Sequence, residues 1–407
     1  MLSPRAPAQS LEMANQVTHS SEKPETILTH GGRNPADHFG FVNTPVYRGS
    51  TVLFPTLDAI EGRTQPYGYG RTGNPSTTDV EAVVTALEGA AGTRLAPSGL
   101  SAITTALMSV VGSGDDILVT DSAYEPTRNV CNTVLGRMGV STRYYDPRIG
   151  AGIADLIGPD TKAVFVESPG SLTFEIQDLP AIADAAHKVG AKVLIDNSWA
   201  TPLYFKPLEL GADMVIHAGT KMFVGHSDAM SGTISANAAT FEQLAATHRA
   251  MGICAAPDEA YLIARGLRTL SIRMQEHRRR ALDIASWLEG QDGVAAVLHP
   301  ALESHPDNAL FRRDFSGSGS LFSVLLEPAP REAVAALVDN MRVFGMGYSW
   351  GGYESLILPT KPGRVRTAVP WVAEGNLLRL HIGFEDVDDL KADLSDGLER
   401  YRAARAG

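Results

Sequence analysis

The sequence is poor in cysteine: only Cys131 and Cys254 occur in 407 residues. Neither belongs to a CxxC pair, which excludes a zinc ribbon or a disulfide framework as the basis of the fold. Two thiols in a chain of this length suit a reducing cytoplasm. The chain also lacks any run of about 18 apolar residues, the length that spans a bilayer, so we expect no membrane protein.

The chain has fewer basic than acidic residues. The chain has 35 Lys and Arg against 46 Asp and Glu, a net charge of −11. Such a chain has no global field that attracts nucleic acid or an anionic membrane. The 11 histidines show no HExxH or other ligand spacing, so no metal enzyme is expected either.

What remains is ordinary globular composition, with 44% hydrophobic and 20% charged residues. At about 100–200 residues per domain, the length predicts two domains with a core that is stable without disulfide bonds or metal ions. Residues 1 to about 21 mix Pro, Ser, Gln and Glu and lack the apolar centre of a signal peptide. We expect them to form a weakly ordered tail.

The middle of the sequence alternates short β-branched runs with helical patterns. The predicted strands are Ile117–Thr120, Thr142–Tyr145, Ala163–Val166, Val193–Ile195 and Met214–Ile216. The predicted helices are Thr77–Leu87, Ser101–Val111, Thr127–Arg137 and Leu179–Val189. This alternation is typical of an α/β fold with a mostly parallel sheet, in which ligands bind beyond the carboxyl ends of the strands.

The pattern changes near Asp258. One long helix is predicted over Ala260–Leu288, followed by a strand at Leu321–Leu326, a helix at Arg331–Asn340 and a strand at Leu377–Ile382. These elements predict a second, smaller α+β domain. The expected division is therefore 1–72 for the N-terminal tail and arm, 73–258 for the large domain and 259–407 for the smaller C-terminal domain.

Lys221 follows the buried run Met214–Ile216 by five residues. Burying an ammonium is costly unless the group is paired or loses its charge. A lysine there either forms a Schiff base with a carbonyl cofactor or is an ordinary exposed loop residue. Asp196 ends the run Lys192–Asp196 and has two readings as well. It either keeps a pyridinium nitrogen protonated or caps the following turn.

A phosphate site would complete such a pair. Pro97–Ser101 enters the helix Ser101–Val111 through a glycine, which leaves backbone N–H groups free for an anion, although a plain N-cap explains it equally well. Upstream, Tyr69 and Arg71 offer a hydroxyl and a guanidinium. Gly150–Gly152 hints instead at a dinucleotide fingerprint, but Asp155 stands where its third glycine belongs.

From about Asn43 to Arg400 the chain resembles the Cys/Met-metabolism family of fold type I enzymes, which depend on pyridoxal 5'-phosphate (PLP). The motifs that carry the resemblance are Tyr69–Arg71, Ser98–Leu100, Asp121–Pro126, Glu167–Pro169, Ile195–Ala200, Gly219–Lys221, Gly225–Asp228 and Arg379–Gly383. The resemblance implies a fold type I PLP-transferase. It has a mostly parallel central sheet between helices, a smaller C-terminal domain and an N-terminal arm.

The resemblance also implies residue roles. Lys221 would hold the cofactor and later move protons, Asp196 would pair with the pyridine nitrogen, and Tyr124 would stack on the ring. The residues implied to contact the cofactor are Tyr69, Arg71, Ser98, Gly99, Leu100, Tyr124, Asp196, Thr220 and Lys221. Those implied to contact the substrate are Tyr69, Tyr124, Ser349, Trp350 and Arg379. Catalysis would rest on Lys221 and Tyr124, with Arg379 gripping the substrate carboxylate.

Within the family, Tyr348–Leu356 resembles the bacterial cystathionine β-lyase pattern, whereas γ-enzymes read Glu-Ser-Leu-Gly-Gly there. Gly73–Pro75 resembles the γ branch instead. The expected activity is therefore β-elimination of L-cystathionine to homocysteine, pyruvate and ammonia, in methionine biosynthesis. The alternative is a cystathionine γ-lyase or γ-synthase, or a broader cysteine-S-conjugate β-lyase. The family further implies a homotetramer built from dimers, with Tyr69 and Arg71 reaching into the neighbouring subunit.

Overall fold

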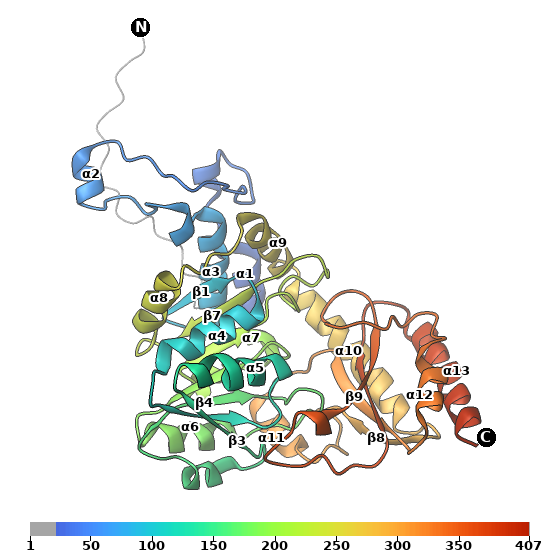
Figure 1. Ribbon diagram of the computed structural model, residues 1–407. Coiled ribbons are helices and arrows are strands. Elements are labelled where there is room, and N and C mark those ends of the chain that lie inside the picture. Colours follow the sequence, from blue (N-terminus) through green and yellow to red (C-terminus); the bar gives the residue numbers. More distant parts are fainter. Residues whose placement is uncertain (1–21, 407) are drawn as a thin grey trace.

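A computed structural model describes residues 22–406, so the tail expected up to residue 21 lies outside them (Figure 1). The chain builds two sheets. The first has seven strands in the order β1-β7-β6-β5-β4-β2-β3. Its strands are β1 (Gly92–Ala96), β2 (Asp116–Thr120), β3 (Ser141–Tyr145), β4 (Thr161–Glu167), β5 (Lys192–Asp196), β6 (Met214–His217) and β7 (Gly232–Ala236).

The expected mostly parallel α/β sheet is confirmed. Strands β3, β2, β4, β5 and β6 pair in parallel, and each contains one of the five predicted strands. Strands β7 and β1 extend the sheet by antiparallel pairing, which the sequence did not predict. Both are five residues long, begin with glycine and contain few large apolar side chains, so they lack the usual signal of a buried strand.

Two hydrophobic clusters cover the two faces of this sheet. Successive side chains of β4 alternate between them, because neighbouring residues of a strand point to opposite faces. Val164 and Val166 join one cluster with α6 (Leu179–His187), and Ala163 and Phe165 join the other with α4 (Gly99–Val110). The parallel strands are therefore buried on both sides, as their continuous apolar runs indicate.

The second sheet is antiparallel, in the order β10-β11-β9-β8. Its strands are β8 (Val294–Leu298), β9 (Leu321–Leu326), β10 (Leu356–Thr360) and β11 (Asn376–His381). It shares a hydrophobic core with α10 (Leu270–Leu288), α12 (Arg331–Val338) and α13 (Val387–Ala406). The remaining α-helices are α1 (Pro24–His30), α2 (Leu57–Glu61), α3 (Pro75–Glu88), α5 (Glu125–Asn129), α7 (Thr201–Tyr204), α8 (Phe241–Ala250), α9 (Pro257–Leu267) and α11 (Asn308–Asp314).

The prediction of one helix over Ala260–Leu288 is wrong: α9 ends at Leu267 and α10 begins at Leu270. A close contact shows why the chain turns here. A Cβ atom at Gly266 would lie 2.2 Å from the carbonyl oxygen of Phe223, so the end of α9 is pressed against the Lys221 loop. Arg273, at the start of α10, then donates hydrogen bonds to the carbonyls of Met222 and Phe223.

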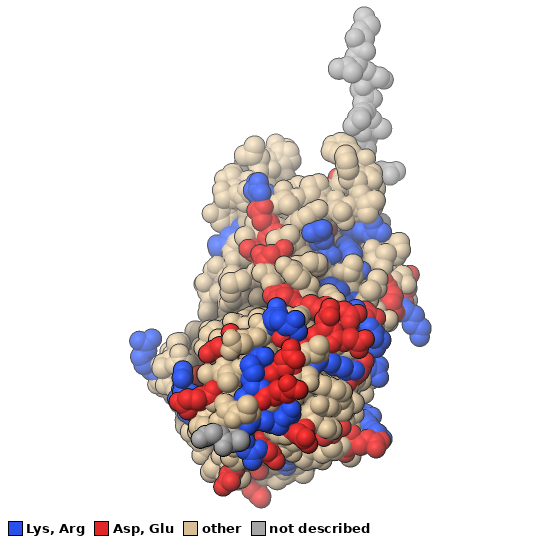
Figure 2. All heavy atoms as spheres, turned by 90° about the vertical axis from the view of Figure 1, so that its right-hand side faces the viewer, with Lys and Arg blue, Asp and Glu red and all other residues tan. Residues whose placement is uncertain are grey.

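The chain between α1 and α3 extends away from both sheets, and α2 lies at its far end (Figure 1). Its large apolar side chains are open to solvent: Phe39 is 99% exposed, Leu53 85% and Leu57 69%. The face that carries α12 and α13 looks different, with acidic and basic side chains interspersed over it (Figure 2). Within residues 22–406, no helix combines the length and apolarity needed to cross a membrane.

Candidate active site

Four chemically active side chains follow neighbouring parallel strands of the large sheet. Tyr124 comes after β2, Glu167 ends β4, Asp196 ends β5 and Lys221 follows β6. Glu167 and Asp196 are direct partners in the β4–β5 register. Since the carboxyl ends of parallel strands share one edge, the fold brings these groups together.

Lys221 lies in the turn between β6 and β7, where its N–H donates to the Ala218 carbonyl at 3.0 Å. Its ammonium donates to the hydroxyl of Ser349 and lies 5.5 Å from the centre of the Trp350 ring. Burial and the charge of Arg379 lower the pKa of Lys221 to about 8, although Asp196 acts in the opposite direction. Lys221 is thus partly buried and contacts two side chains, which favours the first of its two readings over that of an ordinary exposed loop residue.

Two carboxyl groups, Asp196 and Glu167, lie at the ends of the adjacent strands β5 and β4. Asp196 accepts the Ser198 N–H at 2.9 Å, so it also caps the turn, as its second reading predicted. Burial raises the pKa of Asp196, against the opposing effects of Ser198, His217 and Lys221. Burial, together with the charge of Asp196, raises the pKa of Glu167 well above its usual range. Both carboxyls therefore hold a proton more readily than an exposed carboxyl does.

Glu167 also positions Tyr124, which sequence reasoning missed. Its Oε2 accepts the Tyr124 N–H at 2.8 Å. The Tyr124 side chain is 47% exposed toward the open side of the site. Burial, and then the charge of Glu167, raise the pKa of its phenol, so the hydroxyl holds its proton. The sequence gives no signal for this bond, because its donor is a backbone N–H 43 positions away.

The turn into α4 forms an open backbone cradle. Ser98 is the N-cap and its hydroxyl accepts the Ser101 N–H at 3.1 Å, while Gly99 and Leu100 supply the first helical N–H groups. A Cβ atom at Gly99 would lie 2.6 Å from that of Ala218. Thr220 stands on the other side, its hydroxyl tied to the Ser231 carbonyl at 3.1 Å. This cradle fits a phosphate group.

The second sheet contributes Arg379 from β11. Its Nη2 donates to the Ser349 carbonyl at 2.9 Å, and burial lowers its pKa. Ser349 itself has φ +79°, a left-handed backbone that a non-glycine residue rarely adopts. His381, two residues on, lies behind this loop with its Nε2 3.0 Å from the Gly352 carbonyl. Burial lowers the pKa of His381 to about 4, so it is neutral.

Tyr69 and Arg71 lie elsewhere. They form part of the arm, where Arg71 donates to the Arg249 carbonyl at 3.3 Å and lies 5.8 Å from the Tyr69 ring centre. Among residues 22–406, neither shares a hydrogen bond, ion pair or ring contact with Lys221 or Asp196. The fold thus brings four of the expected site residues close to Lys221, namely Thr220, Ser349, Trp350 and Arg379. It does not bring Tyr69 and Arg71 there.

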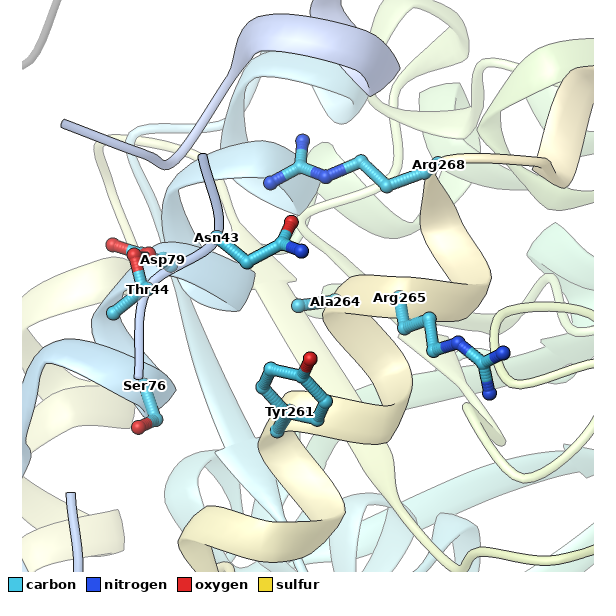
Figure 3. Close-up of a pocket in the computed structure, with 8 residues that line it drawn as sticks. All are labelled: Asn43, Thr44, Ser76, Asp79, Tyr261, Ala264, Arg265 and Arg268. Carbon is cyan, nitrogen blue, oxygen red and sulfur yellow. Dashed lines mark hydrogen bonds between the residues drawn. The ribbon is translucent and has the colours of Figure 1, made fainter. Parts of the chain in front are cut away.

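A cavity of about 400 Å³ opens beside Lys221. It is lined by Thr220, Ser227, Asp228, Ala229, Met230, Glu259, Tyr348, Ser349, Trp350, Glu354 and Leu356. A much smaller cavity, of about 20 Å³, lies where the arm crosses α3 and α9. Figure 3 shows the Asn43 side chain pointing toward Ala264 and Arg268, with Thr44 beside Asp79. In the part of the chain described, no three His, Cys, Asp or Glu side chains are placed to hold a metal ion.

Comparison with known proteins identifies the family. The model of the Cys/Met metabolism PLP-dependent enzymes matches residues 25–399. The chain belongs to this family. A Rhizobium johnstonii protein provisionally named cystathionine beta-lyase is 52% identical, over 91% of this chain and 95% of its own. The cystathionine beta-lyase of Salmonella typhimurium is 43% identical, over 92% and 98%.

Solved structures agree with this assignment. Cystathionine gamma synthase from Xanthomonas oryzae pv. oryzae, in complex with aminoacrylate and cysteine, superposes with a TM-score of 0.88 at 34% identity. The match covers 94% of this chain and 99% of that one. The PLP cofactor of the family fits the residues present. The cradle at Gly99 suits its phosphate, Asp196 suits its pyridine nitrogen, and Lys221 has an amine of lowered pKa.

Proposed function

We propose that this chain is a PLP-dependent cystathionine β-lyase. It converts L-cystathionine and water to homocysteine, pyruvate and ammonia. The observation that carries the proposal is the meeting of Lys221, from the large sheet, with Ser349 and Arg379, from the second. The two β-lyases named above are 52% and 43% identical over 91% and 92% of this chain, and Tyr348–Trp350 resembles the β-lyase pattern.

When bound, PLP supplies an electron sink conjugated to the substrate Cα. The protein supplies the rest. Arg379 binds the α-carboxylate as a bidentate fork, with Ser349 beside it. The amine of Lys221 removes the Cα proton, for which a pKa near 8 suits it, because part of the population is neutral at physiological pH. Lys221, or the protonated phenol of Tyr124, then protonates the departing homocysteine sulfur.

The remaining residues orient these groups. Asp196 would stabilise a positive pyridine nitrogen, while Ser98, Gly99, Leu100 and Thr220 would hold the phosphate. Tyr124 would pack against the cofactor, and Tyr69 would add a hydroxyl from the arm. Trp350 closes the site behind the Lys221 amine, 5.5 Å away, and limits the space on that side.

The γ-lyase or γ-synthase alternative rested partly on Gly73–Pro75. Here Asn74 has a structural explanation, because its side chain accepts the Thr77 N–H at 3.2 Å as the N-cap of α3. Pro75 occupies the first helical turn, where its missing N–H is harmless. A helix start of this kind is independent of the reaction, so it favours neither branch.

We further propose a homo-oligomer, a tetramer formed as a dimer of dimers, in which the arm of one subunit completes the site of another. The exposure of Phe39, Leu53 and Leu57 and the separation of Arg71 from Lys221 support this. The division into 1–72, 73–258 and 259–407 follows the arm and the two sheets. The cytoplasm is the proposed compartment, supported by the free thiols Cys131 and Cys254.

The test is product identity. Purified, PLP-loaded protein is incubated with L-cystathionine and the products are read by mass spectrometry. Homocysteine with pyruvate supports the proposal; cysteine with 2-oxobutyrate would replace it by the γ-lyase alternative. Lys221→Ala serves as the control, and we expect its turnover to fall by at least about a thousandfold, because it loses the proton-transferring amine.

A further inference from the structure

One buried carboxylate to which no role has yet been assigned joins the two sheets. Asp121 follows β2 and is fully buried. Its side chain accepts three successive backbone N–H groups, those of Thr367 at 2.9 Å, Ala368 at 2.9 Å and Val369 at 2.8 Å. These three residues lie in the loop between β10 and β11, which belongs to the other sheet. Three convergent amides form an anion-binding concavity.

Arg128 completes this contact from the large sheet side. Its Nη1 donates to Asp121 Oδ1 at 2.8 Å, and its Nη2 donates to the Thr367 hydroxyl at 2.9 Å. Both side chains of the ion pair are at most 5% exposed. Burial alone would raise the pKa of Asp121, but the loop amides and Arg128 outweigh it and lower that pKa. The carboxylate is therefore charged when it binds the loop.

A second ion pair fixes the same loop. Arg366 binds Glu175, with exposures of 4% and 3%, and it also donates to the Thr173 hydroxyl. Thr173 and Glu175 belong to the segment that follows β4, immediately after Glu167. The β10–β11 loop is thus tied to the segments that follow two neighbouring strands of the large sheet.

The segments on both sides of these contacts continue into the candidate active site. Asp121 begins the turn that presents Tyr124, three residues later. The loop it binds runs directly into β11, which carries Arg379. Arg379 lies ten positions after Val369, and from Asn376 onward the chain is fixed by pairing with β9 and β10.

We propose that Asp121 is a positioning residue. By binding the Thr367–Val369 amides, it sets the distance between Arg379 and the Tyr124 turn. This deepens the proposed function and rests on it, because it assigns Arg379 to the substrate carboxylate. Asp121 touches neither substrate nor cofactor; it fixes where the carboxylate anchor stands relative to the groups on the large sheet.

The test compares Asp121→Asn with Asp116→Asn in the PLP-loaded enzyme. Asp116 is a matched control at the amino end of the same strand, where it binds Arg143 at 2.9 Å and Thr161 at 2.8 Å. Both substitutions remove one buried carboxylate paired with an arginine. We expect Asp121→Asn to raise KM for L-cystathionine about tenfold, because misplaced anchors weaken substrate alignment. Asp116→Asn should leave KM within about twofold, since only thermal stability depends on it.

A readout that needs no substrate accompanies this comparison. Trypsin cleaves after arginine, and Arg366 is protected by burial in the wild type. We expect cleavage between Arg366 and Thr367 to accelerate at least about tenfold in Asp121→Asn and not in Asp116→Asn, because the loop opens locally. Thr367→Val gives a milder variant. It removes the hydroxyl that Arg128 binds without leaving a carboxylate unpaired, and we expect about a threefold change in both readouts.

The outcomes separate the two proposals. Raised KM with faster cleavage at Arg366 supports the positioning role. Equal KM and equal cleavage in Asp121→Asn and Asp116→Asn overturn it, as does faster cleavage with unchanged KM, which makes Asp121 a merely structural tie. If Asp121→Asn does not fold, Thr367→Val decides by the same criteria. Failure of the proposed function shows independently, as absence of cystathionine turnover in the wild type.

Discussion

The amine of Lys221 should titrate far below an ordinary lysine. Its pKa of about 8 results first from burial and then from the charge of Arg379. At pH 8 half of the Lys221 amines are then neutral, whereas an ordinary lysine with a pKa near 10.4 is neutral in roughly 0.4% of molecules. The structure thus predicts roughly 120-fold more reactive amine at this position at pH 8.

Pulse labelling measures this directly. The cofactor-free protein is exposed briefly to acetic anhydride, which reacts only with neutral amines, at half-unit steps from pH 6 to 11. Labelling of the Lys221 peptide is read by mass spectrometry against Nα-acetyl-lysine in the same tube. The midpoint of the pH curve is the observable, because the absolute rate also depends on access. We expect a midpoint near pH 8.

Two variants test the cause. Arg379→Met removes a charge that lowers the pKa of Lys221, so the midpoint should rise. Asp196→Asn removes a charge that raises it, so the midpoint should fall. A wild-type midpoint at pH 10 or above would refute the reasoning, because the site would then exert no net effect on its lysine.

Three further predictions concern the rest of the chain. Burial lowers the pKa of His299 to about 3, so the folded protein loses stability as the pH falls from 6.5 toward 3. His299→Phe should therefore reduce the drop in Tm between pH 7.5 and pH 5. An unchanged drop would contradict this prediction. Burial raises the pKa of Asp79 to about 6, so its contribution is lost as the pH rises from 3.8 through 6. Asp79→Asn should therefore raise Tm at pH 8 more than at pH 5, and a fall at pH 8 would show that its bond to Thr44 matters more. Arg71→Ala and Lys221→Ala should each be inactive alone. If each site takes its arm from a neighbouring subunit, refolding the two variants together should restore about a quarter of wild-type activity. No recovery would place Arg71 in the site of its own subunit.

Much of the large sheet could be predicted because its parallel strands are buried on both faces and read as apolar runs. The same reasoning placed Lys221 and Asp196, since each directly follows such a run. Strands β1 and β7 were not predicted, because their small residues leave no hydrophobic pattern. The break between α9 and α10 escaped because its cause is a contact between Gly266 and Phe223, 43 positions apart.

The residues around the site that the sequence did not reveal were missed for one physical reason. Glu167, His381 and Asp121 act through partners distant in sequence: the Tyr124 amide, the Gly352 carbonyl and the Thr367–Val369 amides. Backbone partners leave no trace in side-chain identity, so nothing in the sequence shows where a buried carboxylate or imidazole will find them. Arg379 and Ser349 came only from the family resemblance.

The placement of Arg379 on an inner strand has a consequence for how such a site can change. Strand β11 lies between β9 and β10 and is hydrogen-bonded along both edges, so the backbone that carries Arg379 cannot shift without moving the whole sheet. Tyr348, by contrast, is 87% exposed on a loop. Any engineering for longer or shorter thioethers is therefore best directed at the Tyr348–Trp350 loop, which can vary in length and shape while the carboxylate anchor stays in place.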